Sequence, residues 1–135
     1  MKNSDLADKI RRLLQKETRY KADAYAFVNA AVNYAAAQEN SDEKKHIAAL
    51  ELLEGIRDFA FRQYGPFAVE VLKSWGLNTA SDIGNIVFML IDEKALFASE
   101  NDSPEDFNVD FDLFKPPFEA MSGKNVNDIK VPKIV

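Results

Sequence analysis

Hydrophobic residues recur at helical spacing in five stretches of the chain, at residues 4–16, 21–38, 47–64, 66–75 and 79–94. Within each stretch an apolar side chain returns every three or four positions, which gathers these side chains on one face of an α-helix. Polar runs or glycines separate the stretches. The pattern therefore predicts five helices that pack through their apolar faces.

Capping residues and glycines mark where these helices should begin and end. Ser4 is expected to cap the first helix, and Thr79 or Ser81 the last, because their hydroxyls can accept hydrogen bonds from free backbone N–H groups. Gly65 and Gly76 stand where a helix often ends in a left-handed conformation.

The fourth stretch has an unusually wide apolar face for its length. Its apolar residues are Phe67, Ala68, Val71, Leu72 and Trp75. Because a helix that is apolar over most of its circumference is usually covered on several sides, this width predicts deep burial.

The period of the pattern changes after residue 94. Val109, Phe111 and Leu113 are separated by the acidic residues Asp110 and Asp112, and alternation of this kind is typical of a half-buried strand. We therefore expect residues 95–113 to form a short β-hairpin.

Together these elements predict a mainly α fold. A compact domain of five helices and a C-terminal hairpin would occupy residues 1–115, and residues 116–135, which carry prolines and no sustained period, would form an extended and partly disordered tail. The order of helix 66–75, turn, helix 79–94 and hairpin also allows a winged-helix-like second half.

Composition narrows the possible chemistry. The 135 residues are 47% hydrophobic and carry a formal charge of -5, which is typical of a folded, soluble protein. The absence of cysteine excludes disulfides and thiolate metal sites, and a single histidine excludes sites that need two imidazoles. No apolar stretch is long enough to cross a bilayer and no signal-peptide core follows the start, so we expect a cytoplasmic protein without membrane contact.

Charge is unevenly distributed along the chain. Residues 1–21 contain seven basic and three acidic groups, whereas residues 75–115 contain two basic and nine acidic groups. The two regions could attract different partners or each other. We favour attraction within the chain.

Several segments between residues 20 and 114 resemble those of one protein family. They are Tyr25-Ala26-Phe27-Val28, Glu51-Leu52-Leu53-Glu54-Gly55-Ile56-Arg57, Tyr64-Gly65-Pro66-Phe67-Ala68, Trp75-Gly76, Asp82-Ile83-Gly84-Asn85-Ile86-Val87-Phe88 and Asp102-Ser103-Pro104-Glu105-Asp106-Phe107. In combination they resemble a small family of uncharacterised bacterial proteins, described as conserved hypothetical proteins of verrucomicrobia and planctomycetes. The chain departs from that family at His46-Ile47-Ala48-Ala49, where members tend to have Ser-Gly two positions after the histidine. The resemblance implies no activity, because none is assigned to the family.

Two regions could in principle bind nucleic acid. Helix 79–94 occupies the place of a recognition helix, but it offers Asp82, Asp92 and Glu93 against the single cation Lys94, so we do not expect duplex DNA as a partner. The first helix is basic. Its cations, with one that follows it, are Lys9, Arg11, Arg12, Lys16 and Arg19. Because no aromatic residue lies among them to stack a base, a solvated helix face is the favoured interpretation.

Metal and catalytic sites are not expected. Acidic residues gather at Asp102, Glu105, Asp106, Asp110 and Asp112, but they lack the glycine and the spacing of a calcium loop. His46 follows Asp42 and Glu43 and precedes Glu51, so a carboxylate could orient it as a general base. No nucleophile motif or phosphate loop accompanies it. We therefore expect no cofactor and no catalysis.

The candidate interaction residues lie at the start of the tail. They are Phe114, Pro116, Pro117, Phe118 and Met121. The two prolines favour an extended backbone with little entropy to lose, so the apolar side chains could dock on the chain's own body, on a second copy or on a partner.

The leading hypothesis is a noncatalytic domain that binds another protein or itself. The alternatives are a winged-helix-like regulator associated with nucleic acid and, third, a small enzyme or metal-binding protein.

Overall fold

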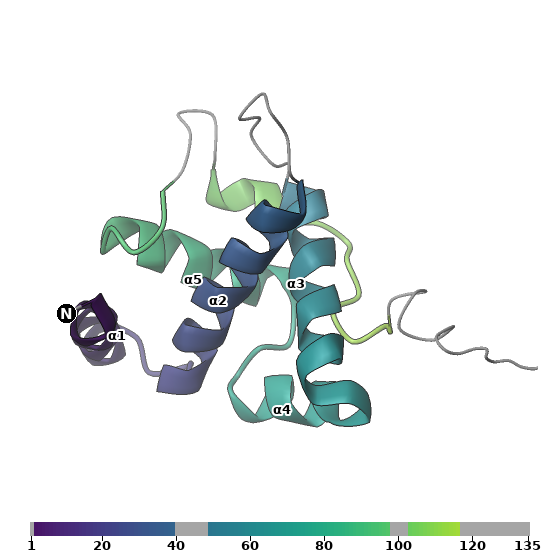
Figure 1. Ribbon diagram of the computed structural model, residues 1–135, viewed down its shortest axis with the longest axis horizontal. Coiled ribbons are helices and arrows are strands. Elements are labelled where there is room, and N and C mark those ends of the chain that lie inside the picture. Colours follow the sequence, from purple (N-terminus) through teal and green to yellow (C-terminus); the bar gives the residue numbers. More distant parts are fainter. Residues whose placement is uncertain (1, 40–48, 98–102, 117–135) are drawn as a thin grey trace, which may run out of the picture.

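The computed structural model describes residues 2–39, 49–97 and 103–116, and these residues are mainly helical, as expected (Figure 1). The elements are α1 (Lys2–Lys16), α2 (Ala22–Glu39), α3 (Ala49–Tyr64), the 3-10 turn η1 (Gly65–Phe67), α4 (Ala68–Ser74), α5 (Ala80–Asp92) and the 3-10 turn η2 (Pro104–Phe107). Among the helices of these ranges, none combines the length and apolar composition needed to cross a membrane.

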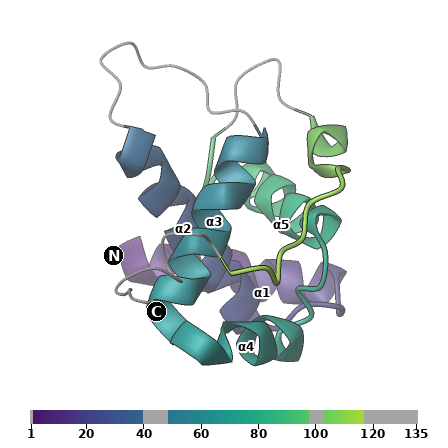
Figure 2. The same cartoon turned by 90° about the vertical axis from the view of Figure 1, so that its right-hand side faces the viewer.

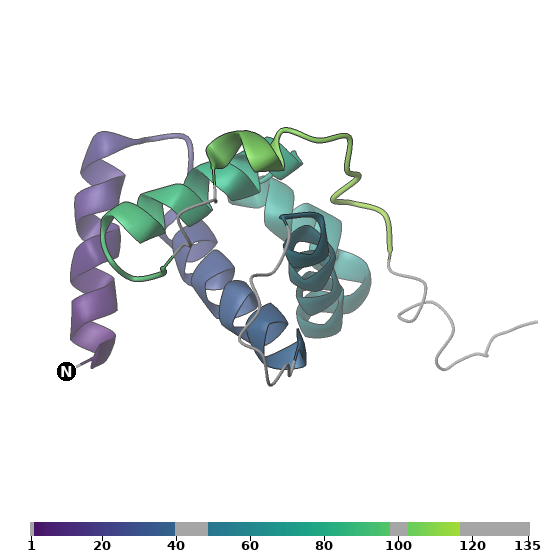
Figure 3. The ribbon, with the colours of Figure 1, turned by 90° about the horizontal axis from the view of Figure 1, so that it is seen from above.

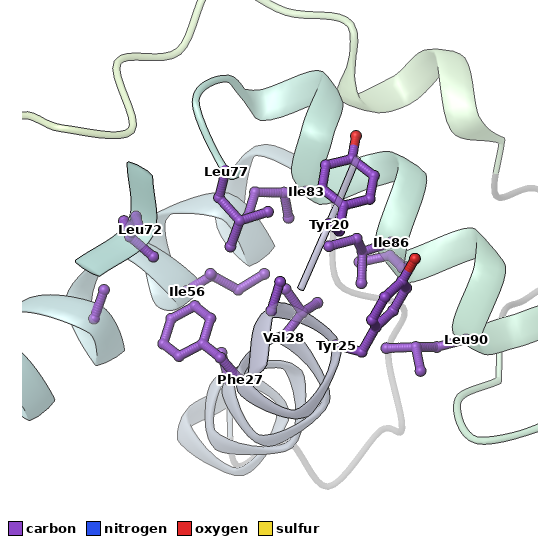
Figure 4. Close-up of a cluster of buried hydrophobic side chains, with 14 of the residues drawn as sticks. Tyr20, Tyr25, Phe27, Val28, Ile56, Leu72, Leu77, Ile83, Ile86 and Leu90 are labelled. Carbon is purple, nitrogen blue, oxygen red and sulfur yellow. The ribbon is translucent and has the colours of Figure 1, made fainter. Parts of the chain in front are cut away.

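The helices pack against one another in one body, and the second half of the chain does not form a separate unit. α1 is at one edge of the molecule, α3 and α4 are at the other, and α2 and α5 lie between them (Figures 1 and 3). The core forms where α2, α3 and α5 face one another. Figure 4 shows Tyr25 and Val28 of α2 pointing toward Ile86 and Leu90 of α5, with Ile56 of α3 beside them. Burial of each such aliphatic side chain contributes about 1.5–3 kcal/mol.

Small residues let α2 and α3 approach closely. A Cβ on Gly55 of α3 would lie only 2.6 Å from the Cβ of Ala35 of α2, so the two helices touch at a point where one of them has no side chain. The alanine-rich sequence of α2 thus has a packing role as well as a high helix propensity.

A second close approach joins the turn after α4 to the turn before α2. Gly76 follows α4 with φ +95°, and a Cβ there would collide with the carbonyl oxygen of Arg19, which precedes α2. The N–H of Lys21 donates to the carbonyl of Trp75 at 3.2 Å. A glycine is therefore required at this position both for its conformation and for the space it leaves.

The start of α5 is fixed by a network of hydrogen bonds. Thr79 caps the helix, as expected, and forms a reciprocal capping box with Asp82. The hydroxyl of Tyr20 donates to Asp82 Oδ1 at 2.7 Å and accepts from Asn85 Nδ2 at 3.0 Å. Burial of the phenol, with the Asp82 carboxylate beside it, raises the pKa of Tyr20 to about 12. The segment before α2 is thereby held on the N-terminal turn of α5.

The basic first helix is paired with the acidic end of α5. Arg12 Nε lies 2.9 Å from Glu93 Oε1, and Lys16 Nζ lies 3.6 Å from Glu93 Oε2. Lys9 Nζ donates to the carbonyl of Lys94 at 3.2 Å. These contacts confirm the expected attraction between the two oppositely charged regions of the chain.

The structure corrects two expectations about helix boundaries. α1 begins at Lys2, so Ser4 lies inside its first turn and is not the cap. α3, η1 and α4 follow one another without a non-helical residue between them. Apart from the short turn η2, the described ranges therefore contain four continuous helical segments and not five separate helices, because Gly65 and Pro66 bend the helical path without ending it.

The expected hairpin is wrong for the described part of residues 95–113, which contains no strand. Ser103 and Asp106 form a capping box and Pro104 occupies the first turn, so this segment folds as η2. The alternating residues that follow form an irregular segment with a bend at Val109 and a turn at Leu113 and Phe114, and Leu113 is buried whereas Val109 is exposed. Without a strand pair in the described residues, the winged-helix-like interpretation is not supported.

The contact between Gly84 and Phe107 yields a stability prediction. A methyl group on Gly84 would lie 2.5 Å from the Cβ of Phe107, so Gly84→Ala should lower the free energy of unfolding by about 1–3 kcal/mol, despite the better helix propensity of alanine. Urea denaturation followed by circular dichroism measures this. In a Phe107→Ala background the same substitution should cost much less. Equal costs in both backgrounds would show that Phe107 does not press on Gly84.

The pairing of α1 with Glu93 yields a pH prediction. The hydrogen bond from Arg12 lowers the pKa of Glu93 below its ordinary value of 4.5. A lowered pKa stabilises the folded state above the unfolded pKa, and this contribution is lost as the pH falls through the folded value. The difference in melting temperature between wild type and Glu93→Gln should therefore shrink as the pH falls from about 7 to about 3. A difference independent of pH would contradict the pairing.

Candidate interaction surface

Residues 108–116, here named the C-terminal arm, cross the outer side of the helical body. The arm leaves η2 near the N-terminal part of α3 and runs along α3 to end beside its C-terminal half (Figures 1 and 2). Three of its side chains, Phe111, Leu113 and Phe114, pack against the core, and Leu113 is only 1% exposed. The arm is thus a non-helical segment that packs on the protein's own helices.

Arg57 of α3 holds the middle of the arm. Its guanidinium carbon lies 4.6 Å from the centre of the Phe111 ring, and its Nη1 donates to the carbonyl of Asp112 at 3.1 Å. The Arg57 Nε is buried and has no hydrogen-bond partner among the described residues. Because a guanidinium over an aromatic face is attracted to the ring quadrupole, one side chain binds both the backbone and a side chain of the arm.

Lys73 of α4 contacts the end of the arm. Its Nζ lies 5.1 Å from the centre of the Phe114 ring, and Phe114 is half-buried against the body. Of the residues expected to mediate an interaction, Phe114 therefore docks on its own chain, and Pro116 is exposed. Pro117, Phe118 and Met121 lie outside the described residues.

The junction between α3 and α4, here named the α3–α4 corner, consists of Gly65, Pro66 and Phe67. Gly65 has φ +55°, and a Cβ there would meet nothing within 4 Å. Phe67 is 68% exposed, which corrects the expectation that the whole apolar face of residues 66–75 is buried. Gly65, Pro66 and Phe67 form a 3-10 turn, which has fewer residues per turn than an α-helix, so Phe67 points away from the side of Ala68 and Leu72.

Phe67 differs from the other exposed large apolar residues in its setting. Leu50 and Phe97 lie close to the ends of described ranges, and Val109 lies on the arm. Phe67 is flanked on both sides by helix, and Pro66 restricts the backbone immediately before it. It is therefore an exposed aromatic side chain on a well-defined backbone.

Five described cations of and near α1 are engaged with acids. The contacts are Lys9–Asp5 (3.1 Å), Arg11–Asp8 (2.5 Å), Arg12–Glu93 (2.9 Å), Lys16–Glu93 (3.6 Å) and Arg19–Glu17 (3.0 Å). A phosphate backbone would have to compete with these carboxylates for each cation.

The acidic residues near the C-terminus have local structural roles. Asp106 completes the cap of η2, Glu105 accepts a hydrogen bond from the Ser103 hydroxyl, and Asp112 Oδ1 accepts from the Phe114 N–H at 3.0 Å. The Ser103 hydroxyl lowers the pKa of Glu105. Asp102 lies outside the described residues, and within them no group of three or more potential ligands could hold a metal ion.

The candidate general base is not placed by the structure. His46, Asp42 and Glu43 all lie outside the described residues, and Glu51 is exposed on α3. Trp75 is half-buried, with its ring 5.5 Å from that of Phe27, so it belongs to the edge of the core.

The sequence did not indicate that Arg57, Lys73 and Phe67 belong to the candidate interaction surface. Arg57 binds the arm. The cation–aromatic contacts join residues more than forty positions apart, so no local pattern indicates them. For Phe67 the signal was present in Gly65-Pro66, which bends the helix directly before it.

Comparison with known proteins found no matching family model, no matching curated protein and no matching solved structure.

The role of Arg57 can be tested by substitution. Arg57→Ala removes the ring contact and the hydrogen bond to Asp112, so it should lower the free energy of unfolding by about 1–2 kcal/mol and speed chymotrypsin cleavage within the arm. Arg62→Ala is the matched control, because Arg62 binds Asp58 on α3 at 2.7 Å. Equal cleavage of the arm in both variants would contradict the role assigned to Arg57.

Proposed function

We propose that this chain is a noncatalytic, cytoplasmic domain that binds another protein through the α3–α4 corner and the end of the C-terminal arm. The single observation that carries the proposal is the 68% exposure of Phe67 on a turn fixed between two helices. We also propose that the chain belongs to the uncharacterised bacterial family that its sequence resembles. Because no activity is assigned to that family, membership would imply none for this chain.

The surroundings of Phe67 support this role. Glu70, Lys73 and Ser74 are exposed on α4, so the aromatic side chain has polar neighbours along the same helix. A central aromatic anchor surrounded by polar residues is the usual arrangement of a protein interface. Because Pro66 and the adjoining helices already restrict the backbone, little conformational entropy would be lost when a partner binds.

The charges of the molecule favour a protein over a nucleic acid as partner. Four cations of α1, namely Lys9, Arg11, Arg12 and Lys16, are paired with carboxylates. Asp82 occupies the first turn of α5, the helix that would have to read base edges. The carboxylate of Asp82 would repel a phosphate backbone at the first turn of α5.

The proposal predicts that binding depends on Phe67. Tagged wild type, Phe67→Ser and Phe97→Ser should be crosslinked in native extract and their recovered proteins quantified. Phe97 is the matched control, since it is 87% exposed and lies beyond the far end of α5. Loss of an interface anchor typically costs about 2 kcal/mol or more, so at least one protein should be recovered about tenfold less with Phe67→Ser than with Phe97→Ser.

Circular dichroism is the control for folding, because Phe67 is mostly exposed and its replacement should leave the helices intact. The proposal is wrong if the two variants recover the same proteins in the same amounts.

A further inference from the structure

We infer that residues 117–121 of the same chain cover Phe67, so that the tail competes with a partner for the α3–α4 corner. The inference rests on the proposed function, because it concerns control of the same surface. Its occupant is the chain's own segment Pro117-Phe118-Glu119-Ala120-Met121.

The place where the described chain ends supports this occupant. The ring of Phe114 lies 5.1 Å from Lys73 Nζ, so the arm reaches α4 two residues before Pro116. Lys73 is six residues beyond Phe67 along η1 and α4, which corresponds to about 10 Å of helix. In Figures 1 and 2 the described arm ends beside the half of α3 that leads into this corner.

The length of chain is comparable with the stretch of helix between Lys73 and Phe67. Phe118 follows Phe114 by four residues, and four residues span at most about 13 Å. Pro116 and Pro117 favour an extended backbone, which increases the reach of a short segment. The nearest aromatic side chain outside the described residues can therefore reach the exposed aromatic side chain of the corner.

The side chains are chemically matched. Phe118 can pack edge-to-face or offset on Phe67, and the thioether of Met121 packs well against aromatic rings. A short tether gives an effective concentration of about 1 mM, so even a contact too weak to hold two separate molecules is substantially populated within one chain.

Disulfide trapping tests the inference cleanly, because the chain contains no cysteine. Glu70→Cys places a thiol on an exposed position one turn from Phe67, and Ala120→Cys places a second thiol in the tail. The double variant keeps both Phe67 and Phe118. Equilibration of the full chain with reduced and oxidised glutathione gives the effective concentration of the two thiols, and mass spectrometry identifies the product.

The matched control carries Phe118→Ser in the same double variant, with an identical tether. The expected result is an intramolecular disulfide with an effective concentration about tenfold higher when Phe118 is present. Equal values with and without Phe118 would overturn the inference, and so would a covalent dimer as the main product, since the occupant would then be a second copy.

Failure of this inference can be distinguished from failure of the proposed function. If Phe118 has no effect on disulfide formation while Phe67→Ser still loses its partner, only the inference about the tail fails. If Phe118 raises the effective concentration while partner recovery does not depend on Phe67, the contact exists and the proposed binding function fails.

Discussion

Burial of α5 is the constraint on which the rest of the structure depends. Nearly half of its residues are buried, and they are Ala80, Ile83, Gly84, Ile86, Val87 and Leu90. They face more than one side of the helix, so no single neighbour can cover them. α2 covers one side of α5 and η2 covers another. At the N-terminal end of α5, Asp82 binds Tyr20 of the segment before α2, and at its C-terminal end Glu93 binds Arg12 of α1.

The position of the candidate surface follows from that burial. Phe107 packs on Gly84 and anchors η2 to α5, which sets the point from which the arm starts. Arg57 then binds the arm on α3, and Lys73 contacts its end on α4. The arm is in this way brought beside α4, the helix that follows the α3–α4 corner.

Local sequence signals predicted the parts of the fold that depend on neighbours along the chain. The helix stripes, the cap at Thr79 and the left-handed glycines at 65 and 76 were correct because each depends on a few consecutive residues. The mutual attraction of the basic and acidic regions also followed from charge alone.

The errors arose where distant contacts decide the outcome. Alternation from Val109 to Leu113 fits a paired strand and an irregular segment packed on helices equally well, and the contact between Arg57 and Phe111 favours the second. A helical wheel assigned Phe67 to the buried face because it ignores the bend at Gly65 and Pro66. A glycine inside a helix, such as Gly84, indicates that another part of the chain packs closely there. It does not indicate which residue does so, and the contact with Phe107 is seen only in the structure.

Native-state hydrogen exchange tests most directly whether α5 is the central element. Amides that exchange only through global unfolding mark the part of a protein on which the remainder depends. The account predicts that the amides of Val87, Phe88, Met89 and Leu90 are the most protected of the chain, and that those of α1 and the C-terminal arm open at lower free energy. Stronger protection in α1 or in the arm than in α5 would contradict it.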